Sequence, residues 1–205
     1  LHVDGAFGLW AAASLRTRHL VDGIERADSW ACDGHKWLNV PYDAGYAFCA
    51  HPDVHATAMA YTASYLTGQE VGREFGGGDF VAESSRRARG FATWAALRSL
   101  GRAGIAELVD RSCVLARRFA EGLRAIEGVA IVNDVVLNQV LVRVGDEATT
   151  NAIQRRLHDD GTLWLGATTW RGQRLLRLSV SNWSTTEADV DRCVAAIARA
   201  MVRNP

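Results

Sequence analysis

The order of apolar segments near the start of the chain most constrains its fold. Residues 1–7, "LHVDGAF", are a short apolar run that leads into turn residues, and residues 28–35 and 44–51 repeat this pattern. The small-residue stretch between the first two runs, residues 8–27, has the composition of a helix. Strand, helix and strand in this order predict part of an α/β sheet, in which functional residues gather at strand ends.

Composition narrows the functional classes. Apolar residues make up 48% of the chain, enough for a soluble globular core, and 23 basic residues balance 23 acidic ones. This balance gives no indication of a nucleic-acid partner. No apolar run is long enough to span a bilayer and no signal peptide is visible, so we expect no membrane association. Because the chain begins without Met and inside a strand pattern, we expect a fragment that lacks an upstream half.

The four cysteines are widely separated, with neither a CxxC pair nor a metal-ligand spacing: Cys32, Cys49, Cys113 and Cys193. Scattered cysteines of this kind are typical of free thiols in a reducing compartment. We therefore expect a cytoplasmic protein without a metal site.

Residues 66–80 differ in character from the segments on either side. This stretch contains five glycines among charged residues, which predicts a loop, since glycine disfavours regular elements. A loop of this length can be a functional lid, and a slack connector is the alternative.

Helical periodicity begins after this loop and extends to about residue 128. We expect Gly101 and Gly104 to bend or divide the long helix and Gly128 to cap it. Two apolar stripes occur at helical spacing, and we expect both to pack in the core. The first comprises Trp94, Leu97 and Leu100, and the second Leu108, Val109, Cys113, Ala116, Phe119 and Leu123.

The rest of the chain alternates strands and helices, which indicates a small separate α/β layer. Strands are predicted over 135–144 and 175–183, with a helix near 147–160 between them and an amphipathic helix over 184–201. Ser184 and Glu187 have the spacing of a capping box at the start of that last helix. We place a domain boundary near residue 88, dividing the chain into 1–88 and 89–205.

Lys36 is the only lysine in the chain, and it lies between His35 and Trp37 at the end of a predicted strand. Partial burial there would lower the pKa of the lysine, because burial disfavours the ammonium form. The neutral amine would then be the nucleophile that a Schiff-base lysine requires. The alternative is a surface lysine in a salt bridge with Asp33 or Asp43.

Asp4 is a carboxylate that could act in the same site as Lys36. A pyridoxal phosphate site needs a lysine that binds the aldehyde carbon and a carboxylate that keeps the pyridine nitrogen protonated. Asp4 and Lys36 are 36 − 4 = 32 residues apart, a separation typical of a strand–helix–strand unit, so each could reach one end of the same ring. His35 is placed to contact the phosphate or to shuttle a proton, and a structural histidine is the alternative.

These residues carry a family resemblance. The segments "HVDGAFG" and "ADSWACDGHKWLNVPYDAG" resemble the group II pyridoxal-phosphate-dependent amino acid decarboxylases, such as the aromatic-L-amino-acid, histidine, glutamate and diaminobutyrate enzymes. The resemblance runs over essentially the whole chain. It implies a fold-type-I, aspartate-aminotransferase-like α/β architecture, with the C-terminal part of the large domain followed by a small C-terminal domain. It also implies an amino acid substrate and a homodimer whose active site lies near the subunit interface.

The same resemblance implies a role for each candidate residue. Asp4 would pair with the pyridine nitrogen of pyridoxal 5'-phosphate, and Ala6 would lie against the ring. Lys36 would carry the Schiff base, and His35 would contact the phosphate or the reacting centre. Arg177, in "LLRLSVSN", matches a strand where some members keep an arginine for the substrate carboxylate. For Arg177 the alternative is an edge-strand side chain that faces water.

The predicted reaction is decarboxylation of an L-amino acid to its amine and CO2. The alternatives are a carbon–carbon lyase or aminotransferase on the same scaffold, and a paralogue that has lost its chemistry. Many members of the family carry a catalytic tyrosine on a mobile loop. The only aromatic residues within 66–80 are Phe75 and Phe80, and Tyr61 and Tyr65 lie just before this loop. If no tyrosine reaches the site, reaction with oxygen would yield an aldehyde in place of the amine.

Overall fold

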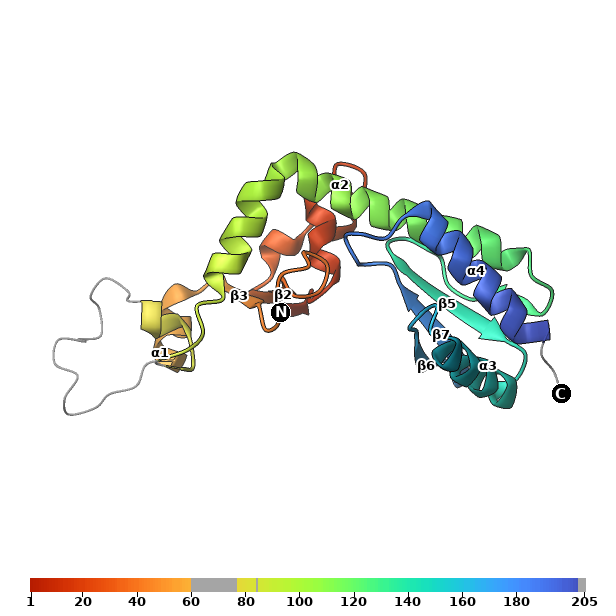
Figure 1. Cartoon of the computed structure of the whole chain (residues 1–205). Helices are drawn as coiled ribbons and strands as arrows, with labels where there is room; N and C mark the ends of the chain where they lie inside the picture. Colours follow the sequence, from red (N-terminus) through yellow and green to blue (C-terminus); the bar gives the residue numbers. More distant parts are fainter. Residues whose placement is uncertain (60–76, 84, 203–205) are drawn as a thin grey trace. The chain divides into compact units, whose positions relative to one another are not determined.

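The structure is a computed structural model that describes residues 1–59, 77–83 and 85–202 (Figure 1). The chain forms two units, one of Leu1–Leu9 with Val21–Ser99 and the other of Trp10–Leu20 with Leu100–Pro205. The loop predicted over 66–80 lies outside the described residues except for its end, where Gly77–Phe80 form a short 3-10 helix, η4.

The first unit is built on a three-stranded sheet with the order β1-β2-β3. Its strands are β1 (His2–Asp4), β2 (Ser29–Asp33) and β3 (Gly45–Cys49), which confirms the three predicted strands. β1 and β2 are parallel, whereas β3 is antiparallel to β2. The carboxyl ends of β1 and β2 therefore lie at the same edge of the sheet.

The connection from β1 to β2 is not the continuous helix that we predicted over residues 8–27. Three 3-10 helices form instead: η1 (Gly8–Ala13), η2 (Arg18–Val21) and η3 (Ile24–Arg26). Local side-chain hydrogen bonds compete with an α-helical ladder here. The Thr17 hydroxyl donates to the Ala11 carbonyl at 2.8 Å, and the Arg16 N–H donates to the Ser14 hydroxyl at 3.1 Å.

After β3 come α1 (Pro52–Met59) and the long helix α2 (Gly90–Arg124). Gly101 interrupts α2 with a φ of 61° and a ψ of −176°, a conformation essentially restricted to glycine, which confirms the predicted break. Gly128 does not cap the helix, which already ends at Arg124. With a φ of 79°, Gly128 lies in the turn that leads to the next strand.

The two apolar stripes of α2 have different environments. The second stripe, Leu108 to Leu123, is buried as predicted. The first stripe is not part of a core in the described chain, because Trp94 is 63% exposed and Leu97 and Leu100 are each 39% exposed. Helical spacing of apolar residues shows which face of a helix is apolar, but that face is buried only where another element covers it.

The second unit contains a four-stranded antiparallel sheet with the order β4-β5-β7-β6. β5 (Gln139–Val144) and β7 (Gln173–Ser179) confirm the two predicted strands. β4 (Val129–Ile131) and β6 (Gly166–Trp170) were not predicted, because the first is only three residues long and the second is poor in buried apolar residues. α3 (Glu147–Asp160) and α4 (Glu187–Val202) confirm the two predicted helices.

One face of this sheet packs against helices to form the main hydrophobic core (Figure 1). Alternate residues of β5 and β7 point into it, as the two-residue period of a strand requires. The helices α2, α3 and α4 contribute their apolar faces. The core includes Leu115, Phe119 and Leu123 of α2, Val140, Val142 and Val144 of β5, Ile153 and Leu157 of α3, Leu176 and Leu178 of β7, and Val190 and Ile197 of α4.

The capping box of α4 is formed by a different pair from the one predicted. The Thr186 N–H donates to the Asp189 carboxylate at 2.8 Å, and the Asp189 N–H donates to the Thr186 hydroxyl at 3.3 Å. Because α4 starts at Glu187, Thr186 is its N-cap and Asp189 its third residue. The Ser184 hydroxyl donates instead to the Asn182 side chain at 3.0 Å.

All four cysteines are free thiols. Within the described ranges no helix is both long and apolar enough to cross a membrane. The described residues likewise include no cluster of three or more His, Cys, Asp or Glu side chains suited to hold a metal ion. The domain boundary near residue 88 and a cytoplasmic location stay predictions.

Candidate active site

The candidate site lies at the edge of the first sheet where β1 and β2 end. Asp4 is the last residue of β1, and Asp33 is the last residue of β2. Two backbone hydrogen bonds hold these ends together: the Gly5 N–H donates to the Ala31 carbonyl at 3.1 Å, and the Asp33 N–H donates to the Ala6 carbonyl at 2.9 Å. The pairing therefore brings the residues after β1 beside those after β2.

A tight turn after β2 presents the lysine. The Gly34 N–H donates to the Ala44 carbonyl at 2.7 Å. A Cβ atom on Gly34 would lie only 2.0 Å from the Tyr46 hydroxyl, so the turn requires glycine for space. Trp37 is 1% exposed and packs against Phe7 with ring centroids 5.1 Å apart. The tryptophan thus anchors the turn.

Lys36 forms an ion pair with Asp33, with Nζ 2.8 Å from Oδ2. The hydrogen bond to Asp33 raises the pKa of Lys36 above its usual 10.5, with smaller contributions from the charges of Asp33, Asp4 and Tyr42, while burial acts in the opposite direction. Burial does lower the pKa of this lysine as expected, but the hydrogen bond to Asp33 outweighs it, so the expected net lowering was wrong. Of the two salt bridges considered for Lys36, the one with Asp33 forms and the one with Asp43 does not. Its role as a Schiff-base lysine stays a prediction.

Asp43 pairs with Arg89 through two hydrogen bonds. Arg89 Nε and one terminal nitrogen donate to the two carboxylate oxygens at 2.6 and 2.8 Å. This arrangement holds the pKa of Asp43 at about 2. Asp43 therefore fastens the segment after the lysine turn to the start of α2.

His35 is held with one ring nitrogen on the backbone and the other toward Asp33. Its Nδ1 lies 3.0 Å from the Ala44 carbonyl, which can only accept, so Nδ1 carries the hydrogen. Its Nε2 lies 3.6 Å from Asp33 Oδ2. The ring packs against Tyr42 with centroids 4.1 Å apart. His35 is thus fixed beside Lys36.

Asp4 and Ala6 complete the group at this edge. The Ala6 N–H donates to Asp4 Oδ1 at 3.2 Å, which orients a carboxylate that is otherwise exposed. The charge of Asp4 also contributes to the raised pKa of Lys36. The structure therefore brings Asp4, Ala6, His35 and Lys36 to one edge of one sheet.

Arg177 belongs to the second unit, on the central strand β7, where it pairs with Leu141 of β5 and Gly166 of β6. It is therefore not on an edge strand, and it does not point into the core. Its side chain is exposed on the face of the sheet opposite the main core. Within the described residues Arg177 forms no ion pair.

Sequence reasoning missed two members of the first site. Asp33 appeared only as a salt-bridge partner in the alternative for Lys36. The available signal was its position three residues before Lys36, at the end of the predicted strand. Tyr42, whose ring lies against His35, gave no signal in the sequence because their contact depends on how the turn folds back.

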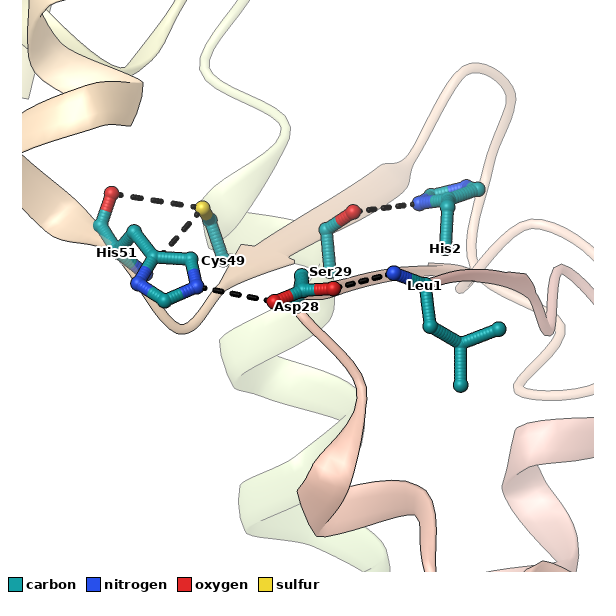
Figure 2. Close-up of polar contacts among 6 residues, drawn as sticks. All are labelled: Leu1, His2, Asp28, Ser29, Cys49 and His51. Atoms are coloured by element: carbon teal, nitrogen blue, oxygen red, sulfur yellow. Dashed lines mark hydrogen bonds and ion pairs between the residues drawn. The ribbon is translucent and has the colours of Figure 1, made fainter.

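A second polar group lies at the opposite edge of the same sheet (Figure 2). Asp28 accepts hydrogen bonds from the backbone nitrogen of Leu1 and from His51, whose Nε2 is 3.1 Å away. The Cys49 thiol contacts the backbone of His51 and not its ring, so there is no thiol–imidazole pair here. This exposed group links the strands but includes none of the predicted site residues.

The second unit also has a groove of about 390 Å³ near the β6–β7 hairpin. It is lined by Val132, Arg143, Trp170, Arg171 and Gln173. The Arg171 guanidinium lies over the Trp170 ring, 4.3 Å from its centroid. No predicted site residue lines this groove.

Comparison with known proteins gives the family to which most of the chain is similar. The family model described as the pyridoxal-dependent decarboxylase conserved domain matches residues 1–144, which include Asp4, Ala6, His35 and Lys36. An aromatic-L-amino-acid decarboxylase of Bacillus atrophaeus is 28% identical over 199 residues, covering 91% of this chain and 42% of that protein. A 4-hydroxyphenylacetaldehyde synthase of Rhodiola rosea is 26% identical over 199 residues, covering 93% and 40%.

Solved structures share the fold. The crystal structure of Oryza sativa TDC with PLP and tryptamine superposes with a TM-score of 0.90 at 23% identity, covering 98% of this chain and 44% of that one. The predicted fold-type-I α/β architecture is therefore confirmed. The chain spans less than half the length of these relatives.

Proposed function

Since the chain belongs to the pyridoxal-dependent decarboxylase family, we propose that the protein decarboxylates an L-amino acid to its amine and CO2, with Lys36 carrying the cofactor as a Schiff base. The observation that carries the proposal is the meeting of Asp4 and Lys36 at one edge of the first sheet. Both lie within the residues that match the family. The substrate class and the whole reaction are part of the proposal.

The residues at this edge fit pyridoxal phosphate chemically. The cofactor requires a primary amine for its aldehyde and a carboxylate for its pyridine nitrogen, and Lys36 and Asp4 provide one of each. Ala6, whose N–H donates a hydrogen bond to the Asp4 carboxylate, has a small side chain that would leave space for a flat ring. When bound, the cofactor supplies an electron sink for the electrons that are released as CO2 leaves.

Each residue then has a defined task. Asp4 would hold the proton on the pyridine nitrogen, because a carboxylate stabilises the adjacent cation. Lys36 would hold the cofactor's aldehyde carbon through Nζ, which must be neutral to do so. His35, with Nδ1 fixed on the Ala44 carbonyl, directs Nε2 toward the same edge for the phosphate or the reacting centre.

Arg177 is proposed to bind the substrate carboxylate. Its guanidinium is exposed, is paired with no acid in the described part of the chain, and can form two parallel hydrogen bonds with a carboxylate. We also propose a homodimer whose active site lies near the subunit interface, which rests on the family resemblance.

An aldehyde is a second candidate product. Residues 66–80 contain no tyrosine, and one relative bears the name 4-hydroxyphenylacetaldehyde synthase. This loop lies mostly outside the described residues, so the proposal of an aldehyde product rests on the sequence alone. A lyase, an aminotransferase and a non-catalytic paralogue remain the alternatives to decarboxylation.

The test is a product assay with the full-length protein. It is incubated with pyridoxal phosphate and a panel of aromatic, acidic and basic L-amino acids, and CO2, amine, aldehyde and keto acid are measured for each. We expect CO2 from one substrate class, with amine in equal amount. Aldehyde in place of amine would support the second candidate, and keto acid without CO2 would contradict decarboxylation.

A further inference from the structure

Asp33 occupies the centre of the candidate site. Its Oδ2 atom lies 2.8 Å from Lys36 Nζ and 3.6 Å from His35 Nε2. Its backbone is fixed at the end of β2, where its N–H donates to the Ala6 carbonyl at 2.9 Å. The Asp33 side chain is 20% exposed and that of Lys36 is 38% exposed, so water partly screens this ion pair.

We propose that Asp33 is a positioning residue that holds Lys36 as an ammonium ion and so sets the pH at which the lysine amine becomes reactive. The first part of this inference concerns the protein alone. The second part, reaction of the amine with an aldehyde cofactor, rests on the proposed function.

The other charged groups that face Lys36 affect its pKa less than the hydrogen bond to Asp33 does. Asp4 at the end of β1 and Tyr42 in the following loop act in the same direction as Asp33, and burial opposes them. His35 points its Nε2 at the same Asp33 oxygen and thus competes for it when protonated. Asp43 is already bound by Arg89 at 2.6 and 2.8 Å.

The chemistry makes the ammonium form matter. An ammonium group must first lose one proton to a base in solution before its nitrogen can attack an aldehyde carbon. The new C–N bond then becomes an imine as the aldehyde oxygen leaves as water with the two remaining N–H hydrogens. At pH values below the lysine pKa, each unit of pKa changes the fraction of neutral amine about tenfold.

Removing the Asp33 charge should therefore lower the pKa of Lys36. Because Lys36 is 38% exposed, water screens part of the Asp33 charge. We therefore expect the Lys36 pKa to fall by only about 0.5–1 pH unit. The corresponding gain in neutral amine at pH 8 is about 3- to 10-fold.

The measurement is an NMR titration of the cofactor-free protein labelled with ¹³C,¹⁵N-lysine, with the Lys36 signal assigned by its loss in Lys36→Arg. We expect the Lys36 pKa to fall by about 0.5–1 unit in Asp33→Asn and to return in Asp33→Glu. Asp43→Asn is the matched control and should leave it unchanged. An unaltered Lys36 pKa in a folded Asp33→Asn protein would overturn the inference.

The wild-type protein offers a second measurement if Asp33→Asn does not fold. The Lys36 Nζ signal should move on acidification, because Nζ lies 2.8 Å from the Asp33 carboxylate. A titration from pH 7 downward should show this change while the protein stays folded. A Lys36 signal that does not respond before unfolding would contradict the pairing.

Imine formation with pyridoxal phosphate, followed by absorbance over a pH series, separates this inference from the proposed function. We expect its apparent pKa to be lower in Asp33→Asn than in wild type. Imine formation with the same pH dependence in both proteins would overturn the inference and leave the proposed function standing. A lowered Lys36 pKa with no imine in either protein would support the ion pair and contradict the proposed function.

Discussion

The two units of the molecule differ in what holds them together. The main hydrophobic core lies entirely in the second unit, where three helices cover one face of a four-stranded sheet. The first unit has few large buried side chains, notably Trp37, Leu38 and Val40, yet it carries the lysine and the carboxylates of the candidate site. Short turns, backbone hydrogen bonds and ion pairs position the candidate site. Stability and candidate chemistry therefore reside in different parts of the chain.

The largest expected effect tests the chemistry of the first unit. Lys36→Arg keeps the positive charge and the pairing with Asp33, but a guanidinium cannot form the imine. We expect CO2 release to fall by about 10³-fold or more with little change in the free energy of unfolding. Comparable turnover by this variant would show that the chemistry does not pass through Lys36.

A core substitution tests the second unit. Leu176 on β7 is fully buried, so Leu176→Ala should lower the free energy of unfolding by about 2–5 kcal/mol, as urea titration measures. Leu141→Ala, on the opposite face of the neighbouring strand β5, is the matched control and should cost less. Equal losses would mean that the core does not determine stability as described.

Asp4→Asn sharpens the comparison because it removes a charge from the first unit with almost no change in shape. We expect turnover to fall by about 10²-fold, since the charge that stabilises the cofactor's protonated nitrogen is lost. The melting temperature should stay close to that of wild type. Asp22→Asn, at an exposed site in the same unit, provides the control. Similar turnover in both variants would remove Asp4 from the proposed site.

The smallest expected effect concerns the cap of α4. Thr186→Ala removes the hydroxyl that accepts from the Asp189 N–H and should cost about 1 kcal/mol in the free energy of unfolding. Ser184→Ala should change it by no more than about 0.5 kcal/mol, because that hydroxyl contacts only the Asn182 side chain among the hydrogen bonds described. Chemical denaturation measures the loss of unfolding free energy in each variant. A larger loss in Ser184→Ala than in Thr186→Ala would favour the cap predicted from the sequence.

Several features were predictable because they depend on local order along the chain. The strand pattern around residues 1–51 predicted β1, β2 and β3, and parallel pairing then required that Asp4 and the start of the lysine turn share an edge. The break of α2 at Gly101 was likewise predictable, because few other residues can adopt that conformation.

Other features depend on contacts that the sequence does not reveal. The direction of the Lys36 pKa change was missed because it depends on where the Asp33 side chain points. The stripe at Trp94 has the right spacing for burial, but the described chain provides no element that covers it. The predicted helix over 8–27 failed because Ser14 and Thr17 engage the backbone locally.

The most direct test of the account is to find where the cofactor attaches. The full-length protein would be incubated with pyridoxal phosphate, reduced with borohydride, digested and analysed by mass spectrometry. The account predicts a pyridoxyl group on Lys36 that disappears in Lys36→Arg. Cofactor bound by the folded protein with no modification of Lys36, or with modification of a different residue, would contradict it.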